Sequence, residues 1–401
     1  MSIRRSLLAL PAAIALLGLA ACAGEAATGD TPPVSDGDGH SDVAGAEEVA
    51  EAPLALLSVD ADGEVGLLDL IDGAASDIGT VGEPLAFAGD GRYGFVSTVD
   101  GLEIVDSGRW TWIHGDHDHY YRGEPRLIGT LPGGGVATVA SGLLSTAGST
   151  GVFFAESGHA VLLDNASLAD GEVVERFRVP TGADAGLVAP LDDGALVTIG
   201  DELVFHDATG VASGWTTVCD EASGAMTTNV GLVVGCADGA VLATWDDDAP
   251  VFERIPYPGD AEAEPATAFD GRTGRPTVAG AAGTTGFWLL DTRALAWRYV
   301  ATDVALARVA AIDDADGHVV ALDVDGRMRV YLAGSGEEAA ATEPLVSEVD
   351  SSVSLSVDER RAYVNDAEGD TVIEIDFADG ARIARTLETP TSPEFVTEVG
   401  R

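Results

Sequence analysis

Three of the seven histidines in this 401-residue chain fall within six residues of one another, in the stretch HGDHDH. Residues two apart on an extended segment face the same side, so His117 and His119 are expected to point together. Gly115 permits a tight turn that brings His114 back to the same point. Zinc takes imidazole nitrogen and carboxylate oxygen in tetrahedral sites. The spacing therefore predicts a zinc site made by the three histidines, with Asp116 as a further ligand.

The composition of this stretch favours zinc over other metals. It contains no cysteine or methionine, which argues against Cu(I), and calcium or magnesium would require oxygen ligands instead of imidazoles. The alternative is a polar surface loop in which histidines cluster by chance. The flanking aromatic residues, Trp110, Trp112, Tyr120 and Tyr121, favour an ordered loop.

Four histidines lie elsewhere in the chain. His159 is the best outside candidate for the metal site, because it belongs to the sequence unit that follows the cluster. Strand direction, however, predicts that its turn lies on the opposite face. His206 and His318 are expected at strand ends as surface residues, and His40 stands alone in the N-terminal segment.

The elements that must position the cluster are short apolar runs, broken by Gly-Asp, Asp-Gly and Gly-Gly turns, with no sustained helical spacing. Such runs predict β-strands joined by tight turns. The strands group in fours, and one unit consists of Pro84–Ala88, Tyr93–Ser97, Leu102–Asp106 and Arg126–Leu131. Similar units begin near Gly135, Gly186, Gly224, Pro265, Ala307 and Val353. Four-stranded units of this period predict an all-β fold, the β-propeller.

The two ends of the repeat region complement each other. The run from Leu54 resembles a unit without its first strand, and the run ending at Gly400 resembles a first strand alone. Pairing of these strands would complete a blade and close the ring, which removes open sheet edges. We therefore expect eight four-stranded blades, with seven as the alternative.

The N-terminal residues predict export. Arg4 and Arg5 precede an apolar run, which ends in Leu-Ala-Ala-Cys at Cys22. This order resembles the lipobox of bacterial lipoproteins, so residues 1–21 are expected to be a signal peptide. An ordinary signal peptide with a chance cysteine is the alternative. Residues 22–52 lack aromatic residues and predict a flexible acidic tether, and residues 53–401 form the predicted propeller domain. The mature protein is expected at the cell surface, lipid-anchored at the outer side of the cytoplasmic membrane.

Two further cysteines lie in the predicted propeller domain. Cys219 and Cys236 are expected to form a disulfide, because an exported chain meets an oxidising compartment.

The charge of the chain limits its partners. The formal net charge of −46 argues against nucleic acid as a partner, since nucleic-acid binding requires a basic surface.

The sequence is similar to AztD-type zinc metallochaperones. The resemblance is carried by DSGRWTWIHGDHDHYYRGEPRLIGTLPG, RAYVNDAEGDTVIEIDFADGARIARTLET and TPTSPEFVTEVGR, and covers most of the mature chain. It implies an exported β-propeller that binds zinc through the histidine cluster and delivers it to the solute-binding protein of a zinc ABC importer. Family histidines near the start of central units are missing, and carboxylates stand there instead: Asp184, Asp220 and Glu221.

The sequence thus predicts a zinc-binding metallochaperone and no enzyme. An alternative function is a lipid-anchored propeller scaffold that binds protein without a metal. A metal-dependent propeller hydrolase would need a set of acidic or histidine ligands at the starts of first strands. The chain offers only Asp184, Glu221 and Glu264 for that purpose.

Overall fold

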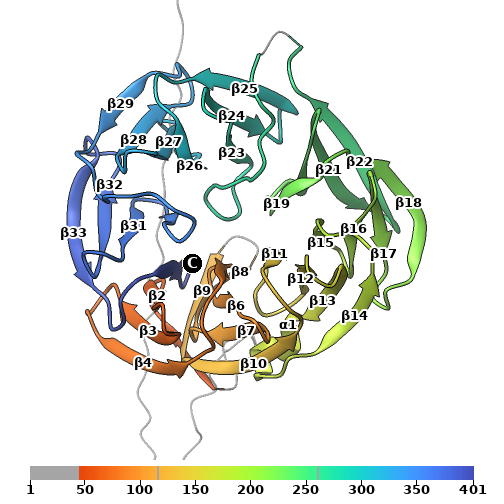
Figure 1. The fold of residues 1–401 in the computed structure, drawn as a ribbon, viewed down its shortest axis with the longest axis horizontal. Coiled ribbons are helices and arrows are strands. Elements are labelled where there is room, and N and C mark those ends of the chain that lie inside the picture. The colour runs from red at the N-terminus through yellow and green to blue at the C-terminus, as the bar shows by residue number, and fades with distance from the viewer. Residues whose placement is uncertain (1–44, 115–116, 260–261) are drawn as a thin grey trace, which may run out of the picture. The chain divides into compact units, whose positions relative to one another are not determined.

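Eight small antiparallel sheets form a ring in the computed structural model, which describes residues 45–114, 117–259 and 262–401 (Figure 1). Of Ile113 and His114 it describes the backbone alone. In this part of the chain seven of the sheets in the ring have four strands and one has three, and a ninth sheet of three strands is attached to them. The predicted eight-bladed propeller is thereby confirmed, and the seven-bladed alternative is wrong.

The blades are numbered here in chain order, and their strands are given from the inside outwards. Blade 1 consists of β34 (Phe395–Val399), β2 (Ala55–Val59), β3 (Glu64–Asp69) and β4 (Ala75–Thr80). Blade 2 consists of β5 (Ala86–Gly89), β6 (Tyr93–Ser97), β7 (Gly101–Asp106) and β10 (Arg126–Pro132). Blade 3 consists of β11 (Ala137–Ser141), β12 (Ser149–Phe154), β13 (His159–Asp164) and β14 (Glu175–Pro180). Blade 4 consists of β15 (Val188–Leu191), β16 (Gly194–Ile199), β17 (Glu202–His206) and β18 (Ala212–Val218).

The remaining blades repeat this order. Blade 5 consists of β19 (Ser223–Thr227), β20 (Leu232–Cys236), β21 (Gly239–Asp246) and β22 (Ala249–Pro256). Blade 6 consists of β23 (Thr277–Ala281), β24 (Gly286–Asp291) and β25 (Ala296–Ala301). Blade 7 consists of β26 (Leu306–Ala311), β27 (His318–Asp323), β28 (Met328–Leu332) and β29 (Glu338–Ala341). Blade 8 consists of β30 (Leu355–Val357), β31 (Ala362–Asp366), β32 (Thr371–Asp376) and β33 (Arg382–Glu388).

Packing between neighbouring blades explains why the middle strands are apolar on both sides. Successive side chains of a strand point to opposite faces of its sheet. Leu56 therefore packs against blade 8, whereas Leu57 packs against blade 2. In the described residues, eight hydrophobic clusters fill the spaces between consecutive blades, the last of them between blades 8 and 1. The ring is therefore held together by burial at every joint.

The two ends of the domain close the ring as predicted. Strand β2 pairs with β34 in antiparallel register, with Ala55 opposite Val399 and Val59 opposite Phe395. The last strand thus supplies the inner strand of blade 1. The pairing satisfies backbone groups that would otherwise form an open edge.

Blade 6 departs from the four-stranded pattern. The predicted unit begins near Pro265, but the first regular strand is β23, at Thr277. Residues before it lie beside β23 without a ladder, and Asp270 forms a single bridge with Ala279. The next residue, Gly271, bridges in parallel to Ala311 of blade 7. The inner position of this blade is therefore occupied by irregular chain.

The ninth sheet and one short helix lie outside the blades. The sheet contains β1 (Ala46–Val49), β9 (His117–Gly123) and β8 (Arg109–His114), in that order. The helix α1 (Asn165–Asp170) was not predicted, because six residues are too few for a periodic pattern. Its caps are nevertheless in the sequence: Asp164 accepts a hydrogen bond from the Ser167 amide, and Gly171 ends the helix at a φ of 87°.

Strand β1 corrects the predicted limits of the tether. Composition predicts a flexible segment over residues 22–52, whereas Ala46–Val49 pair with β9. Composition measures how much apolar surface a segment can bury, and this strand is held by backbone hydrogen bonds to a hairpin that offers an edge. The rest of the predicted tether, up to residue 44, lies outside the described residues, as do Cys22 and His40.

The predicted disulfide between Cys219 and Cys236 is present, with a Cα–Cα distance of 5.0 Å. Cys219 follows the outer strand of blade 4, and Cys236 ends the second strand of blade 5. The bond therefore joins two neighbouring blades. Both side chains lie in the hydrophobic cluster between these blades.

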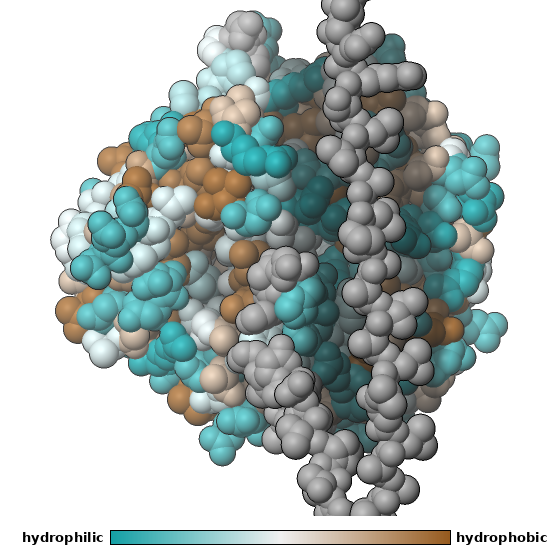
Figure 2. Space-filling view, turned by 180° about the vertical axis from the view of Figure 1, so that it is seen from behind, coloured by the Kyte–Doolittle hydropathy of each residue, from teal (hydrophilic) through white to brown (hydrophobic). Residues whose placement is uncertain are grey.

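The face seen in Figure 2 carries hydrophilic residues, with hydrophobic residues gathered in places between them. The outer strands contribute to this surface, since β4 has no buried residue, whereas every residue of β2 is buried. Among residues 45–114, 117–259 and 262–401, no helix has the length and hydropathy needed to cross a membrane.

Candidate metal centre

The predicted metal ligands lie at the end of a β-hairpin inserted between the third and fourth strands of blade 2. Figure 1 shows β8 and β9 extending from this blade toward the middle of the ring. In the register of the hairpin, His114 is opposite His117, Trp112 is opposite His119, and Trp110 is opposite Tyr121. Gly115 and Asp116, which connect the two strands in the sequence, are outside the described residues.

Aromatic packing orders the base of this hairpin. The rings of Trp110 and Tyr121 are stacked with centroids 5.2 Å apart, and both side chains are buried. The guanidinium carbon of Arg92 lies 4.0 Å from the centroid of the Trp110 ring, and Asp106 holds the same guanidinium through two hydrogen bonds. Burial, followed by the charge of Glu48, raises the pKa of the Tyr121 phenol above its ordinary value. The base of the hairpin is therefore part of the packed structure.

One hydrogen bond fixes the hairpin to a neighbouring blade. The Thr111 hydroxyl donates to the carbonyl of Gly400, which follows β34 of blade 1, with a distance of 2.8 Å. Within the hairpin, a guanidinium nitrogen of Arg109 in β8 donates to the carbonyl of Gly123 in β9 at 2.8 Å. The first bond therefore ties β8 to the ring, and the second ties the base of β8 to the base of β9.

His117 and His119 lie together on one face of β9. Their ring centroids are 4.8 Å apart, and the imidazole of His119 lies 6.1 Å from the ring of Trp112. His117 is exposed, and the side chain of His119 retains 18% of its accessible surface. The structure therefore brings together two of the predicted ligands at a position that solvent can reach.

Glu48 of β1 is a member of this site that the sequence did not indicate. Its Oε1 lies 2.7 Å from Nδ1 of His119. A carboxylate accepts hydrogen bonds, so this contact favours the arrangement in which Nδ1 of His119 donates to Glu48. The residue falls in a segment whose composition predicts a tether, and its only sequence signal is the two adjacent glutamates of β1.

The structure describes part of the predicted ligand set. It describes the backbone of His114 alone, and Asp116 lies outside the described residues. Among the side chains that are described, no three from His, Cys, Asp and Glu form a group that could hold a metal ion. The described part of the site thus consists of two candidate ligands, His117 and His119, and of Glu48, which contacts His119.

The other histidines that the structure describes lie away from this hairpin, and His206 and His318 are buried, so the prediction of surface positions for them is wrong. His159 begins β13, whereas the residues after the far end of β13 form α1, which lines a cavity together with Trp112. His159 is therefore at the opposite end of that strand from the hairpin. His206 is buried with Nδ1 3.2 Å from the carbonyl oxygen of Val204. The imidazole of His318, also buried, lies with its Nδ1 2.6 Å from a carboxylate oxygen of Asp314.

The carboxylates at places where the resembling family has histidines do not extend the site. Asp184 lies between β14 and β15, and Asp220 and Glu221 lie between β18 and β19. All three are exposed, and they belong to two different connections between blades. Glu264, before β23, is exposed as well.

The hairpin separates two cavities. One, of about 860 Å³, is lined by Trp110 and Trp112 together with residues of α1. The other, of about 590 Å³, is lined by Thr111, Asp118 and Tyr120, which are the alternate residues of the same two strands. The face that carries His117 and His119 is thus distinct from the face that lines the second cavity.

The ring of eight blades defines the fold as a β-propeller, and comparison with solved structures agrees with this fold. No protein-family model matches the sequence. The structure is similar to AztD from Citrobacter koseri, with a TM-score of 0.74, 18% identity and coverage of 86% of this chain and 97% of AztD. The apo structure of the same protein gives 0.72, with the same identity and coverage. The AztD resemblance predicted from the sequence is thereby confirmed for the fold.

A more distant similarity is to the dihydro-haem d1 dehydrogenase NirN in complex with DHE. Its TM-score is 0.57 at 16% identity, with coverage of 88% of this chain and 76% of NirN. Propellers host many unrelated functions, so both likenesses define the fold, and the function must be argued from the site.

Proposed function

We propose that this protein is an extracytoplasmic zinc-binding metallochaperone that delivers zinc to the solute-binding protein of a zinc ABC importer. The observation that carries the proposal is the register of the hairpin, in which His114 is opposite His117 and the His117 and His119 rings are adjacent. Residues directly opposite in an antiparallel pair share a face, which supports a common site for all three histidines. The AztD-like fold and the sequence resemblance to AztD-type chaperones support zinc as the metal.

The proposed ligands are His114, His117 and His119, with Asp116 in the fourth position. Four nitrogen and oxygen ligands satisfy tetrahedral zinc. Asp116 belongs to neither strand of the hairpin, so water or a ligand from another protein could replace it in the coordination sphere without changing the strand pairing.

Glu48 is proposed to orient His119. A metal-binding histidine commonly donates its second ring N–H to a carboxylate, which fixes the tautomer and makes the other nitrogen a better ligand. The 2.7 Å contact between Glu48 and Nδ1 of His119 has this form, with Nε2 as the nitrogen proposed to bind the metal. Glu48 therefore acts as a positioning residue and not as a ligand.

Transfer is proposed to occur by ligand exchange. A site at the end of a hairpin is accessible from several directions, so a histidine of the solute-binding protein can enter the coordination sphere of the zinc before the hairpin ligands leave. Stepwise replacement keeps the metal bound throughout. Imidazoles bind metal only when neutral, so affinity should fall as the pH drops through about 6.5, the reference pKa of imidazole.

The test of zinc binding is a competition titration of metal-free protein against a chromophoric chelator. Replacing both His117 and His119 by Ala is expected to weaken binding by at least ~100-fold, since two ligands are lost. His159→Ala, at the other end of β13, is the control and should leave affinity unchanged. Unaltered binding in the double variant would contradict the proposed site, and weaker binding in the control would add His159 to it.

The test of delivery uses the zinc-loaded protein and a metal-free solute-binding protein, with a strong chelator present to trap released zinc. If zinc reaches the solute-binding protein faster than the chelator captures released zinc, direct exchange between the two proteins is supported. If the two proteins associate equally well without metal and no zinc moves, the protein is instead a propeller scaffold, the main alternative.

The anchor at Cys22 belongs to the same proposal. It is supported by the order of charged, apolar and small residues before this cysteine. Labelling cells with a radioactive fatty acid should mark the wild-type protein and leave Cys22→Ser unlabelled. Equal labelling of the two proteins would exclude this residue as the site of lipid attachment.

A further inference from the structure

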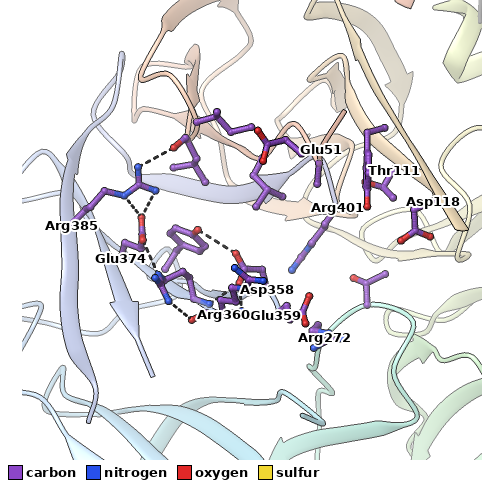
Figure 3. Close-up of a pocket in the computed structure, with 18 residues that line it drawn as sticks. Glu51, Thr111, Asp118, Arg272, Asp358, Glu359, Arg360, Glu374, Arg385 and Arg401 are labelled. Carbon is purple, nitrogen blue, oxygen red and sulfur yellow. Dashed lines mark hydrogen bonds and ion pairs between the residues drawn. The ribbon is translucent and has the colours of Figure 1, made fainter. Parts of the chain in front are cut away.

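The cavity of about 590 Å³ on the other face of the hairpin is lined by an unusual number of arginines for so acidic a protein (Figure 3). It lies among the β8–β9 hairpin, the irregular segment before β23, the β30–β31 turn and the end of β34. Five arginines line it: Arg272, Arg360, Arg361, Arg385 and Arg401. Its volume is in the range of small-molecule sites, which is about 300–1,000 Å³.

Two of these arginines differ from every other arginine that the structure describes. The guanidinium groups of Arg272 and Arg360 make no hydrogen bond and no ion pair with any described residue. The other described arginines each use their guanidinium group within the protein. In a chain with 67 acidic residues and 21 basic ones, a guanidinium without a partner is unexpected, and both of them line the same cavity.

The backbone holds both arginines in place while their side chains remain unpaired. The Arg272 amide donates to the carbonyl of Ala311 at 2.9 Å, beside the bridge between Gly271 and Ala311. The Arg360 amide donates to a carboxylate oxygen of Asp358 at 2.5 Å, in the β30–β31 turn. Their positions therefore follow from ordered turns and not from free chain.

The remaining arginines show how the other charges of the cavity are balanced. Arg361 and Arg385 bind the two carboxylate oxygens of Glu374 at 3.1 and 2.5 Å, as the dashed lines in Figure 3 show. One guanidinium N–H of Arg401 donates a hydrogen bond to the carbonyl oxygen of Val357. Its Nε is buried and has no hydrogen-bond partner among the described atoms.

Three exposed carboxylates also line the cavity, namely Glu51, Asp118 and Glu359. Carboxylates without an ion pair are common on a surface with this excess of acidic residues, so these three do not identify a ligand. Their negative charge nevertheless limits the size and charge of any ligand that the cavity can accept. A long polyanion would meet repulsion from the whole protein, whereas a small anion would meet the directional donors of the cavity.

We propose that this cavity binds a small polycarboxylate, with Arg272, Arg360 and Arg401 donating hydrogen bonds to its carboxylate oxygens. Guanidinium groups bind carboxylates through two parallel hydrogen bonds, and such charge-assisted bonds are about twice as strong as neutral ones. A ligand with two or three carboxylates can engage donors that come from three different parts of the ring. This site lies on the Asp118 and Tyr120 face of β9 and does not depend on zinc or on the proposed chaperone function.

The test is calorimetric titration of metal-free protein with tricarballylate at low ionic strength, with acetate as a monocarboxylate reference. Tricarballylate lacks the hydroxyl group that makes citrate a strong chelator, so residual metal does not affect the result. We expect one saturable site, binding at least tenfold weaker in the double variant Arg272→Gln and Arg360→Gln, and no saturable binding of acetate. Arg293→Gln is the control, because it removes one exposed arginine of blade 6 outside the cavity.

Three outcomes would overturn the proposal. They are the absence of saturable tricarballylate binding, an equal loss of binding in the Arg293→Gln control, and tighter binding of a hexa-aspartate peptide than of tricarballylate. The last would show that the arginines receive an acidic protein segment. Because neither guanidinium has a partner among the described residues, the double variant should keep the wild-type circular dichroism spectrum and melting temperature. A loss of binding then cannot be attributed to unfolding.

Discussion

The blades and the histidine hairpin are built from the same element, an antiparallel pair of short strands, but they differ in what covers them. A middle strand of a blade such as β6 is buried along its whole length, because neighbouring blades cover both faces of the sheet. In the hairpin sheet, burial ends at Trp110 and Tyr121, and His117 beyond them is exposed. The comparison indicates that burial is concentrated in the ring, whereas the candidate metal ligands lie on an extension that the ring supports at one end.

The first prediction tests this division through protein stability. Phe95 is 1% exposed and packs in the cluster between blades 2 and 3. Phe95→Ala should lower the free energy of unfolding by about 3–5 kcal/mol, through lost burial and the cavity that remains. His117→Ala should change it by no more than about 0.5 kcal/mol, because this side chain is on the surface. Urea unfolding of the two variants checks both values, and similar losses would contradict the division.

The second prediction concerns the hairpin alone. Glu48→Gln should weaken zinc binding by ~10-fold, because an amide orients His119 less well than a carboxylate does. Glu47→Gln is the matched control, since Glu47 is the adjacent residue of β1 and pairs with Arg122 across the sheet. Both variants should unfold at the wild-type urea concentration. Equal zinc affinities for the two variants would remove Glu48 from the site.

The third prediction compares Glu48 with a carboxylate inside the ring. Glu398 of β34 is fully buried, and neither of its carboxylate oxygens has a hydrogen-bond partner among the described atoms. The nearest charged nitrogen, of Arg401, is 3.6 Å away. Burial raises the pKa of Glu398 well above its ordinary value, with Arg401 opposing this shift and Asp358 and Glu374 adding to it.

The sign of the pH effect follows from this direction. A carboxyl group whose pKa is raised in the folded state binds its proton more tightly there, so its contribution to stability is present at low pH and is lost as the pH rises. Glu398→Gln removes the titration. Relative to this variant, the wild type should therefore lose stability as the pH rises above the ordinary pKa of a glutamate, about 4.3. The effect should be smaller than that of Phe95→Ala. Urea unfolding at several pH values measures it, with the exposed Glu388→Gln as a control, and a difference that stays constant with pH would contradict it.

The repeat pattern allowed most of the ring to be predicted. The unit written as Tyr93–Ser97 and Leu102–Asp106 corresponds to β6 and to β7, which begins one residue earlier. These strands are recognisable because burial on both faces requires continuous apolar residues, and the turns require glycine or aspartate. Blade 6 was less predictable, since backbone contacts to Ala279 and Ala311 replace the ladder of a first strand there.

The candidate metal site was predicted in part. The spacing of His117 and His119 indicated a shared face, and their rings are adjacent. Glu48 could not be found in the same way, because it lies 71 residues before His119 in the chain and reaches it only through the pairing of β1 with β9. The lack of a described ion pair at Arg272 and Arg360 could not be predicted either, because a sequence does not indicate which charged side chains meet in the fold.

The sequence by itself predicted eight blades, the closing strands, the disulfide and a cluster of candidate metal ligands, because these predictions follow from local periodicity, residue chemistry and spacing. Only the tertiary structure decided which residues distant in the chain meet: Glu48 with His119, and arginines from three parts of the ring around one cavity. The physical reason is that such contacts depend on how whole sheets pack. Packing is set by the sum of many weak interactions between blades and not by any short stretch of residues.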